Sequence, residues 1–339
     1  MRLPEPEHIP IDSVPALNWG VIGPGKIATS FVGTTLKNTA QKFRAVASRS
    51  KERAEQFAHK FSIDSVYENY SQLVESSEID AVYIASWQVD HFEHAMLALN
   101  AGKHVLVEKP ITYSPAEARQ IFDLAKSKGL LAMEAMWTRY LPQSSIIRKL
   151  VADSDLGAPR LLSANFCVDN SHSARLWTKG GGGIIYDMGI YPIAIAQQFM
   201  GNPIKITATG KVDENNLDME SFVTLEYESG ARSQIISSGV STIPTTASCG
   251  FENGVVVIDE PFFVPSGIRL RDKNLYFKEQ SWRDESSIQG HEGLCYQATH
   301  FAKYVSEGRV ESPIHNAHDT VANIEVAAEI SKQIGSKPV

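Results

Sequence analysis

The sequence predicts an α/β chain of two domains. The first is built on a parallel, doubly wound sheet, and the second is an α+β domain with a large, mostly antiparallel, open-faced sheet. Short apolar runs alternate with longer amphipathic segments from residue 17 to about residue 136, as in βαβ units. Strand-like segments then follow one another closely, which indicates antiparallel pairing. The length of 339 residues also exceeds what one core of ordinary size holds.

We divide the chain into an N-terminal arm at 1–16, a first domain at 17–137 and a second domain at 138–339. The apolar runs of the first domain lie at 17–23, 43–48, 81–86, 104–109 and 130–136. The amphipathic segments between them predict helices at 26–37, 51–61, 90–100 and 114–128. Ser114 is a suitable helix cap, because its hydroxyl accepts hydrogen bonds from free amides and the following Pro115 fits the first turn.

The second domain begins with helical segments at 144–151 and 183–200. Its strand-like segments lie at 206–212, 219–227, 231–237, 246–252, 254–259 and 268–272. The last two predicted helices lie at about 294–306 and 317–334. We expect them to pack back against the molecule, and the first domain is one candidate for the surface that they cover. We expect helices on only one side of the antiparallel sheet, so its other face is free to bury against a second copy. This arrangement predicts a homodimer.

Charge and composition exclude several classes of protein. The net charge of −7 is spread without a run of like charges, which argues against nucleic acid as a partner. No run reaches the ~18 apolar residues of a membrane helix, and the acidic, proline-rich start does not resemble a signal peptide. We therefore expect no membrane contact and a cytoplasmic location. Cys167, Cys249 and Cys295 lie far apart and are expected to be buried thiols in a reducing compartment.

Two pairs of histidines lie close together in the sequence, His91 with His94 and His315 with His318. Neither pair has a third ligand at a suitable spacing, so no metal site is predicted. We expect His91 and His94 on a partly exposed helix face. His315 and His318, near a predicted turn, are interpreted in the same way.

A glycine-rich segment follows the first predicted strand and opens the first predicted helix. Gly23, Gly25 and Ala28 match the pattern G-x-G-x-x-A of a Rossmann domain. There the glycines permit a tight turn and the close approach of a pyrophosphate, while Ala28 allows tight helix packing. The helix N-terminus at Lys26 and Ile27 faces the anion. This context favours dinucleotide binding over the alternative of a glycine turn that merely connects two elements.

The residues after the second strand bear on the choice of cofactor. An acidic side chain at that point binds a ribose hydroxyl of NAD, but this sequence has Ser48, Arg49 and Ser50. Arginine matches a 2′-phosphate in charge and in its planar set of donors, and the serines add hydroxyl donors. NADP is therefore favoured over NAD. The alternative is that Arg49 is a solvated loop charge.

The run at 104–110 ends a buried strand with two charges, Glu108 and Lys109, followed by Pro110. Open α/β sheets bind ligands beyond the carboxyl ends of their strands, so Glu108 and Lys109, with Ser86 at the end of run 81–86, are expected to contact the cofactor. A lysine near the nicotinamide is suited to proton transfer. The alternative for Glu108 is a loop salt bridge. The bond before Pro110 is a candidate for a cis peptide.

These motifs, followed in order by Gly-Gly-Gly-Ile-Ile-Tyr-Asp-Met-Gly-Ile-Tyr at 181–191, resemble the glucose-fructose oxidoreductase, inositol dehydrogenase and MocA family (Gfo/Idh/MocA). The resemblance spans about residues 17–330. Residues 133–142 and the tyrosine at 191 are similar to the branch of dimeric dihydrodiol dehydrogenase and D-xylose dehydrogenase. Many inositol dehydrogenase-like relatives have histidine where Tyr191 stands, which disfavours an inositol substrate.

The resemblance implies that Lys109, Asp187 and Tyr191 form the catalytic group. Independently, their spacing places Asp187 and Tyr191 on one side of a predicted helix. We assign Tyr191 as the acid/base, Lys109 as the group that orients the substrate oxygen, and Asp187 as the partner of a hydroxyl. The roles of Lys109 and Tyr191 could be exchanged. Without the resemblance, a helix cap and a core aromatic would explain Asp187 and Tyr191 equally well.

Further residues are candidates for contact with the substrate. Trp137 and Arg139 follow the last strand of the first domain and are expected to wall the nicotinamide pocket, because an aromatic wall suits a sugar or ring diol. Core packing is the alternative for Trp137. The triple glycine at 181–183 lets the backbone pass close to a ligand. Arg175 and His172, shortly before it, could reach the substrate.

The leading hypothesis is an NADP-dependent oxidoreductase, running in either direction. It would move hydride between nicotinamide and a carbinol or carbonyl carbon of a sugar, a dicarbonyl sugar or a trans-dihydrodiol. The cofactor carries this chemistry without a metal. The alternative is a non-catalytic NADP-binding sensor or regulator of the same fold, although the presence of Lys109, Asp187 and Tyr191 together argues against it. A third hypothesis is an oxidoreductase that holds its cofactor permanently and couples two sugars.

Overall fold

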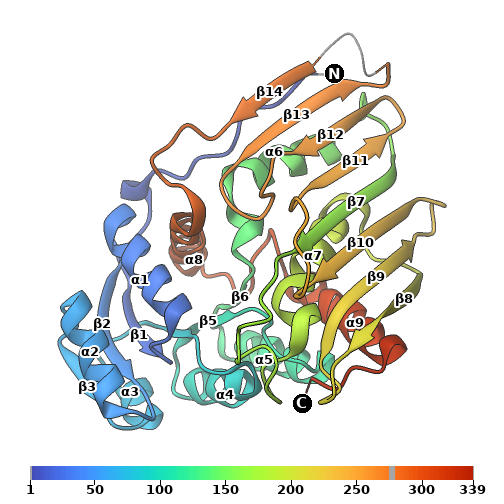
Figure 1. Ribbon diagram of the computed structural model, residues 1–339. Coiled ribbons are helices and arrows are strands. Elements are labelled where there is room, and N and C mark those ends of the chain that lie inside the picture. Colours follow the sequence, from blue (N-terminus) through green and yellow to red (C-terminus); the bar gives the residue numbers. More distant parts are fainter. Residues whose placement is uncertain (1, 275–278, 339) are drawn as a thin grey trace. The chain divides into compact units, whose positions relative to one another are not determined.

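A computed structural model of the chain describes residues 2–274 and 279–338 (Figure 1). The chain divides into two compact units. The six-stranded unit comprises Ile9–Tyr140 and Gly290–Val321, and the eight-stranded unit comprises Met1–His8, Leu141–Gln289 and Ala322–Val339. The segment Gly290–Val321 therefore joins the N-terminal part of the chain, although it follows the whole second sheet in sequence.

The six-stranded unit is built on one parallel sheet with the strand order β3-β2-β1-β4-β5-β6. This is the order of the doubly wound dinucleotide-binding fold, which confirms the parallel sheet predicted from the alternating pattern. The strands are β1 (Asn18–Ile22), β2 (Lys42–Ala47), β3 (Ser65–Tyr67), β4 (Ala81–Ile84), β5 (His104–Glu108) and β6 (Ala132–Ala135).

The helices of this unit begin and end close to the predicted residues, apart from a short one at Tyr70–Glu75 that was not predicted. They are α1 (Lys26–Asn38), α2 (Lys51–Phe61), α3 (Tyr70–Glu75), α4 (His91–Asn100), α5 (Pro115–Lys128) and α8 (Leu294–Ser306). The Ser114 hydroxyl accepts a hydrogen bond from the Glu117 amide, so Ser114 caps α5 as expected. Helix α8 packs beside α1, and the ring of its Phe301 lies 4.7 Å from that of Trp19 in β1, between ring centroids. One of the last two helices thus packs on the parallel-sheet unit.

The eight-stranded unit is built on a sheet with the strand order β14-β13-β12-β11-β7-β10-β9-β8. All neighbours are antiparallel except β7 and β10, so the sheet is mostly antiparallel, as predicted. The strands are β7 (Pro159–Cys167), β8 (Lys205–Val212), β9 (Asp218–Glu226), β10 (Arg232–Ser238), β11 (Ala247–Phe251), β12 (Gly254–Ile258), β13 (Gly267–Asp272) and β14 (Glu279–Arg283).

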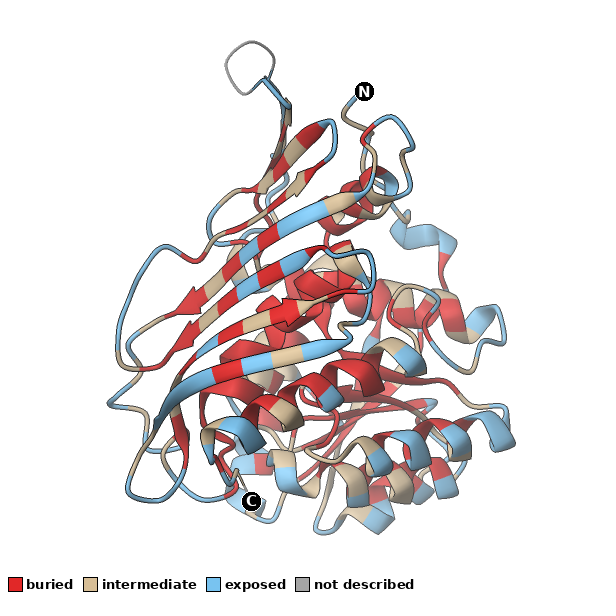
Figure 2. Ribbon diagram, turned by 90° about the vertical axis from the view of Figure 1, so that its right-hand side faces the viewer, coloured by how far each residue is buried: buried red, intermediate tan, exposed pale blue. Residues whose placement is uncertain are grey.

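Helices α6 (Pro142–Val151) and α7 (Ile190–Met200) pack against strands of this sheet, and α9 (Ala317–Ile334) begins in the six-stranded unit and continues into this one. Buried and exposed residues alternate along the strands (Figure 2). Such alternation is the mark of a sheet with one covered face and one open face. Among the residues that the structure describes, no helix is both long and apolar enough to cross a membrane.

Among the strands and α-helices that the structure describes, four were not predicted: β3, α3, β7 and β14. Strands β3 and β14 are short and only partly buried, so they lack a strong apolar pattern. Strand β7 was missed because exposed side chains occupy its first half, yet it lies between β10 and β11 near the middle of the sheet. The three cysteines are buried free thiols, as expected.

Candidate active site

The predicted dinucleotide loop lies between β1 and α1. Gly23 has a φ of +87°, and a Cβ added to it would lie 2.6 Å from the carbonyl oxygen of Ala85 and from the amide nitrogen of Ser86. Glycine is therefore required here by the chain's own packing. A Cβ added to Gly25, in contrast, would meet no described atom within 4 Å. The open space beside Gly25 is where a bound pyrophosphate would need to come close.

Helix α1 begins directly after this opening. Its N-cap residue is Gly25, and no side chain in the described part of the chain caps its first turn at Lys26 and Ile27. Ala28 is fully buried, so the helix starts close against the sheet. Uncapped amides at a helix N-terminus bind anions. The loop thus fits the pyrophosphate of a dinucleotide in both shape and charge.

The residues after β2 are arranged around a solvent-exposed arginine. The Arg49 side chain is 70% exposed, and its guanidinium lies 3.7 Å from the carboxylate of Asp90. The Ser48 hydroxyl accepts a hydrogen bond from the Ser50 amide, and the Ser50 hydroxyl caps α2 by accepting one from the Arg53 amide. Each hydroxyl still has its own hydrogen to donate. The three residues together offer donors that suit a phosphate.

Glu108 ends β5 as a buried acid. One carboxylate oxygen accepts a hydrogen bond from the Tyr83 hydroxyl at 2.6 Å, and the other accepts one from the Lys109 amide at 3.2 Å. Burial raises the pKa of Glu108 to about 7, although these hydrogen bonds and the nearby Lys109 charge act in the opposite direction. The Glu108 carboxyl group is thus buried at the end of the strand, not exposed in a loop.

Lys109 follows Glu108 and precedes a cis peptide bond to Pro110, which confirms the expected isomer. Burial lowers the pKa of His291, and the positive charge of Lys109 lowers it further. The His291 ring stacks on Trp137 with 5.7 Å between ring centroids. Lys109, His291 and Trp137 are thus neighbours at this end of the sheet. Sequence reasoning missed His291, since it lies far along the chain and no motif surrounds it.

The predictions for three of the four histidines were wrong. His91 and His94 are buried on the face of α4 that packs toward the ends of β4 and β5, and His315 is buried too. The His94 ring bonds the Ser86 hydroxyl at 2.8 Å, and the His315 ring bonds the Glu134 carboxylate at 2.8 Å. His318 is exposed, as expected. Burial lowers the pKa of His91 to about 4 and also lowers that of His94.

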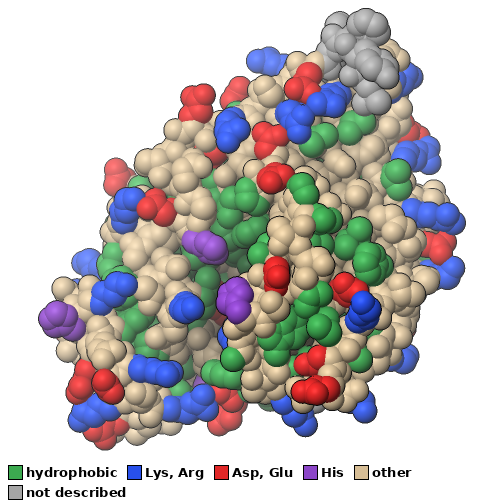
Figure 3. All heavy atoms as spheres, viewed as in Figure 1, with side chains coloured by type: hydrophobic (Ala, Val, Ile, Leu, Met, Phe, Trp, Pro, Cys, Tyr) green, Lys and Arg blue, Asp and Glu red, His purple; other side chains and the backbone are tan. Residues whose placement is uncertain are grey.

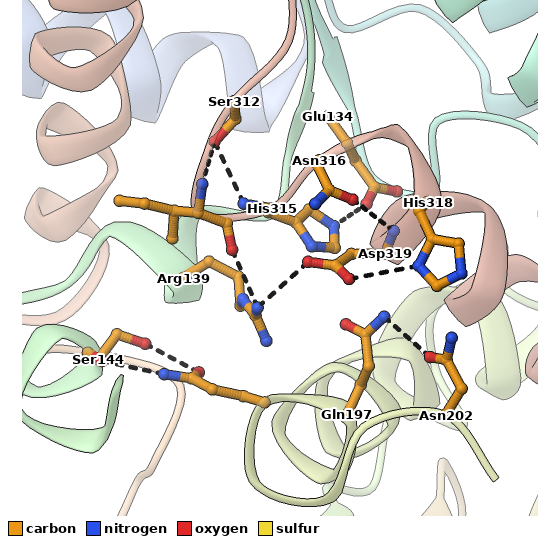
Figure 4. A network of polar contacts seen from close by, with 12 residues as sticks. Glu134, Arg139, Ser144, Gln197, Asn202, Ser312, His315, Asn316, His318 and Asp319 are labelled. Carbon is orange, nitrogen blue, oxygen red and sulfur yellow. Dashed lines mark hydrogen bonds and ion pairs between the residues drawn. The ribbon is translucent and has the colours of Figure 1, made fainter. Parts of the chain in front are cut away.

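Arg139 belongs to a polar network that fastens residues 312–319 to the end of β6 (Figure 4). Its guanidinium donates to the carbonyl of Ile314 at 3.0 Å and lies 3.8 Å from the carboxylate of Asp319. The Tyr140 hydroxyl donates to that of Ser312 at 2.9 Å. Arg139 thus pairs with Ile314 and Asp319 of its own unit, whereas we had expected this arginine to wall the nicotinamide pocket.

Asp187 and Tyr191 lie in the eight-stranded unit, whereas Lys109 belongs to the six-stranded unit. We had predicted one regular helix for the segment that carries Asp187 and Tyr191, but the structure shows a different arrangement. Residues Ile185–Gly189 form a π-helical turn, and α7 begins at Ile190. Asp187 therefore lies on the π turn and Tyr191 just after it. Single π turns of this kind recur at functional sites.

The structure brings two of the predicted site residues together in this unit. Arg175 donates to the carboxylate of Asp187 at 2.8 Å. The ring of Tyr191 lies among aromatic rings, 5.5 Å from Phe166 and 5.6 Å from Phe263 between ring centroids. Phe166 and Phe263 stack on each other at 4.4 Å. Sequence reasoning missed Phe166 because strand β7 was itself not predicted, and it missed Phe263 because that residue lies between β12 and β13, outside any predicted strand.

A buried carboxylate, Asp218, holds the start of the π turn. It accepts hydrogen bonds from the amides of Ile184 at 2.7 Å and Ile185 at 2.6 Å, and from the Ser336 hydroxyl at 2.7 Å. Burial raises the pKa of Asp218, and these donors act against that rise. A carboxylate at a helix N-terminus is stabilised by the helix dipole. Asp218 was not predicted as part of the site.

The triple glycine serves the chain itself. A Cβ on Gly181 would collide with the carbonyl oxygen of Arg175, and one on Gly183, whose φ is +65°, would lie 2.5 Å from the Asp218 carboxylate. We had expected these glycines to make room for a ligand. Gly181 and Gly183 also let the loop pass against Arg175, which pairs with Asp187, and against Asp218, which binds the start of the π turn.

The fold and these site residues define the class of protein: the chain belongs to the Gfo/Idh/MocA oxidoreductase family. Residues 17–136 match the family described as an oxidoreductase family with an NAD-binding Rossmann fold, and residues 145–257 match the GFO/IDH/MocA C-terminal domain. The chain is 31% identical to trans-1,2-dihydrobenzene-1,2-diol dehydrogenase of Mus musculus over 94% of its length and 97% of that protein. It is 30% identical to the Homo sapiens protein of the same name, with the same coverage.

Two solved structures show the same fold. One is a 3-ketoreductase from Actinomadura kijaniata in complex with NADP and TDP-benzene, with a TM-score of 0.82 at 23% identity, covering 94% of this chain and 98% of that one. The other is levoglucosan dehydrogenase in complex with NADH and levoglucosan, with a TM-score of 0.84 at 18% identity, covering 95% and 98%. The predicted family and both predicted domain folds are thereby confirmed.

Proposed function

We propose that this protein is an NADP-dependent oxidoreductase acting on a carbinol or carbonyl carbon of a sugar, a dicarbonyl sugar or a trans-dihydrodiol. One observation carries the proposal. Three features follow the carboxyl ends of strands in one parallel sheet. They are the open, uncapped start of α1 at Gly25, the exposed Arg49, and the turn at residues 109–111 after β5, here called the Lys109 turn. This edge is where such sheets bind dinucleotides. The nicotinamide would give or accept the hydride there.

The choice of NADP over NAD rests on Arg49. A 2′-phosphate carries up to two negative charges and several acceptor oxygens. An exposed guanidinium therefore binds a 2′-phosphate better than it binds a ribose hydroxyl. The contact of 3.7 Å with Asp90 is too long for a hydrogen bond, so a phosphate could replace it without breaking one. The NADP in the ketoreductase structure is consistent with this choice.

The proposed catalytic group is Lys109, Asp187 and Tyr191, assigned from the family pattern. Tyr191 would exchange a proton with the substrate oxygen, and Lys109 would orient that oxygen. Asp187, already paired with Arg175, would accept a hydrogen bond from a second substrate hydroxyl. The rings of Phe166 and Phe263 beside Tyr191 offer an apolar surface for a ring-shaped substrate. A trans-dihydrodiol or a sugar carries both features, a flat apolar face and adjacent hydroxyls.

We also propose that residues 17–137 form the cofactor domain and residues 138–339 the substrate domain, and that the protein is a cytoplasmic homodimer. The open face of the eight-stranded sheet supports the dimer, because Leu161 and Phe222 are 58% and 48% exposed on it. Exposed apolar side chains on a broad sheet face favour burial against a second copy. On the face shown in Figure 3, the described basic and acidic side chains are interspersed. Analytical ultracentrifugation of the protein and of Leu161→Arg measures the association directly.

The test of the function is a fluorescence titration with NADPH and NADH, followed by a panel of sugars, dicarbonyls and trans-dihydrodiols read at the nicotinamide absorbance band. We expect tighter binding of NADPH and turnover that Tyr191→Phe loses. Binding without turnover on the whole panel would favour a non-catalytic sensor. Failure to bind either nucleotide would exclude both functions. Release of the nucleotide on gel filtration would distinguish an exchangeable cofactor from a permanently held one.

A further inference from the structure

His91 occupies an unusual place at the first turn of α4. It is fully buried, and its two ring nitrogens face two different loops. Nδ1 lies 2.9 Å from the carbonyl oxygen of Pro110, and Nε2 lies 3.2 Å from that of Ser86. Ser86 follows β4 and Pro110 follows β5, so one imidazole spans the ends of two neighbouring strands of the parallel sheet.

Both partners of this imidazole are carbonyl oxygens, which only accept hydrogen bonds. A neutral imidazole has one N–H, so it donates to one of the two carbonyls at a time. Burial lowers the pKa of His91 to about 4, which keeps the ring neutral near neutral pH. The titratable groups that act on the ring are His94 on its own helix and Asp90 in the adjoining turn. At any moment the ring therefore holds one of the two loops by a hydrogen bond, and its unprotonated nitrogen only lies beside the carbonyl of the other.

The two loops are those of the proposed chemistry. The Pro110 carbonyl belongs to the turn that begins with Lys109, and the Ser86 amide lies against Gly23, the first glycine of the dinucleotide loop. The next amide of the turn, that of Ile111, donates to the Glu134 carboxylate at 2.9 Å. The Lys109 turn is thus fixed on one side by His91 and on the other by Glu134.

We propose that His91 is a positioning residue that fixes the Lys109 turn relative to the dinucleotide loop. The proposal rests on the proposed function, since it gives Lys109 a place at the reacting oxygen. Because the ring is fully buried and both its nitrogens face backbone carbonyls, the geometry gives His91 a structural role at the turn and not one in proton transfer or metal binding. Small displacements of a reacting group lower rates strongly, so a residue that fixes the turn affects kcat through Lys109.

The first test measures the turn itself. In His91→Phe the ring keeps its size but loses its donor, and we expect faster hydrogen–deuterium exchange in the peptide that covers residues 109–113 of the full-length protein. His91→Gln retains a donor and should exchange more slowly than His91→Phe. His94→Asn is the matched control, since His94 lies on the same helix and bonds the Ser86 side chain instead of a carbonyl of the turn. Unchanged exchange in His91→Phe would overturn the proposal, whatever the activity.

The second test is a double-mutant cycle on kcat, with trans-1,2-dihydrobenzene-1,2-diol and NADP as the probes. We expect His91→Phe to lower kcat by about tenfold to a hundredfold while changing the dissociation constant of NADPH by less than about threefold. In a Lys109→Met background the same substitution should have no further effect on kcat. A His91→Phe effect of equal size in both backgrounds would show a general structural role and overturn the proposal.

The outcomes separate this inference from the function on which it rests. If the unaltered protein turns over no substrate of the panel, or if Lys109→Met keeps full activity, the proposed function or the role of Lys109 fails, and the exchange measurement still decides whether His91 fixes the turn. If both of those hold and the cycle is additive, only the role of His91 fails.

Discussion

The two units hold their proposed catalytic residues in different ways. In the six-stranded unit, Lys109 follows a regular strand, and its turn is bound from two sides, by the His91 ring at the Pro110 carbonyl and by the buried Glu134 carboxylate at the Ile111 amide. In the eight-stranded unit, Asp187 and Tyr191 lie on and after a π-helical turn whose start is bound by the buried carboxylate of Asp218. Both turns thus use a buried carboxylate, which is costly unless its acceptors are satisfied. At the π turn one carboxylate oxygen accepts from two amides, whereas at Lys109 an imidazole contacts the other side of the turn.

The largest effect that tests this comparison is on catalysis. Lys109→Met and Tyr191→Phe should each lower kcat by about 10²- to 10⁴-fold, because each removes a group that acts at the substrate oxygen. Steady-state kinetics with a trans-dihydrodiol and NADP, together with an NADPH titration, measures both changes. A large loss in only one of the two variants would break the comparison, since the account gives each unit an essential group.

The next effect is on stability. Asp218→Ala leaves the amides of Ile184 and Ile185 and the Ser336 hydroxyl without their acceptor, and we expect a loss of about 3 kcal/mol in the free energy of unfolding. Urea denaturation measures it. Asp218→Asn, which keeps one acceptor oxygen, is the control and should lose less. An equal loss in the two variants, or none in Asp218→Ala, would contradict the role given to the carboxylate.

The free energy of unfolding should depend on pH through Glu108, which ends strand β5 of the six-stranded unit. The pKa of Glu108 is about 7 in the fold against a usual value of 4.5, so the folded chain binds more protons between these values. The stability that the neutral acid contributes is fully present below the lower value and is lost as the pH rises through 7. Glu108→Gln imitates the neutral acid and should therefore gain about 2 kcal/mol relative to the original chain between about pH 5 and pH 8. Denaturation of both proteins across this range checks it; a constant difference would show that Glu108 is ionised in the fold.

The smallest effect concerns the cofactor. Arg49→Ala should weaken NADPH binding by about tenfold and leave NADH binding nearly unchanged, because only NADPH carries the 2′-phosphate. Paired fluorescence titrations give the ratio of the two dissociation constants. Asp90→Asn serves as the counterpart, since removing the carboxylate beside Arg49 should strengthen NADPH binding. A loss of both nucleotides in Arg49→Ala would indicate a structural role for Arg49.

The same contrast explains what could be predicted from the sequence. The strand run 104–108, the glycine loop and the Ser114 cap are local patterns, and the structure has them where the residues indicated. The π turn at Ile185–Gly189 has no local signal, because its extra residue is tolerated through the contact with Asp218, 33 and 34 residues further along the chain. His91 was misplaced for a related reason. The polarity of histidine suggested an exposed face, whereas its partners are backbone carbonyls that no sequence pattern reveals.

The measurement that tests the central claim most directly is a single-turnover reaction of the protein with NADPH carrying deuterium at the transferred position of the nicotinamide and a dicarbonyl sugar as acceptor. Mass spectrometry of the product locates the label. The account predicts one deuterium on the carbon that becomes the carbinol, and loss of that transfer in Tyr191→Phe. Label that remains entirely in the nucleotide across sugars, dicarbonyls and the ketones that correspond to trans-dihydrodiols would contradict it.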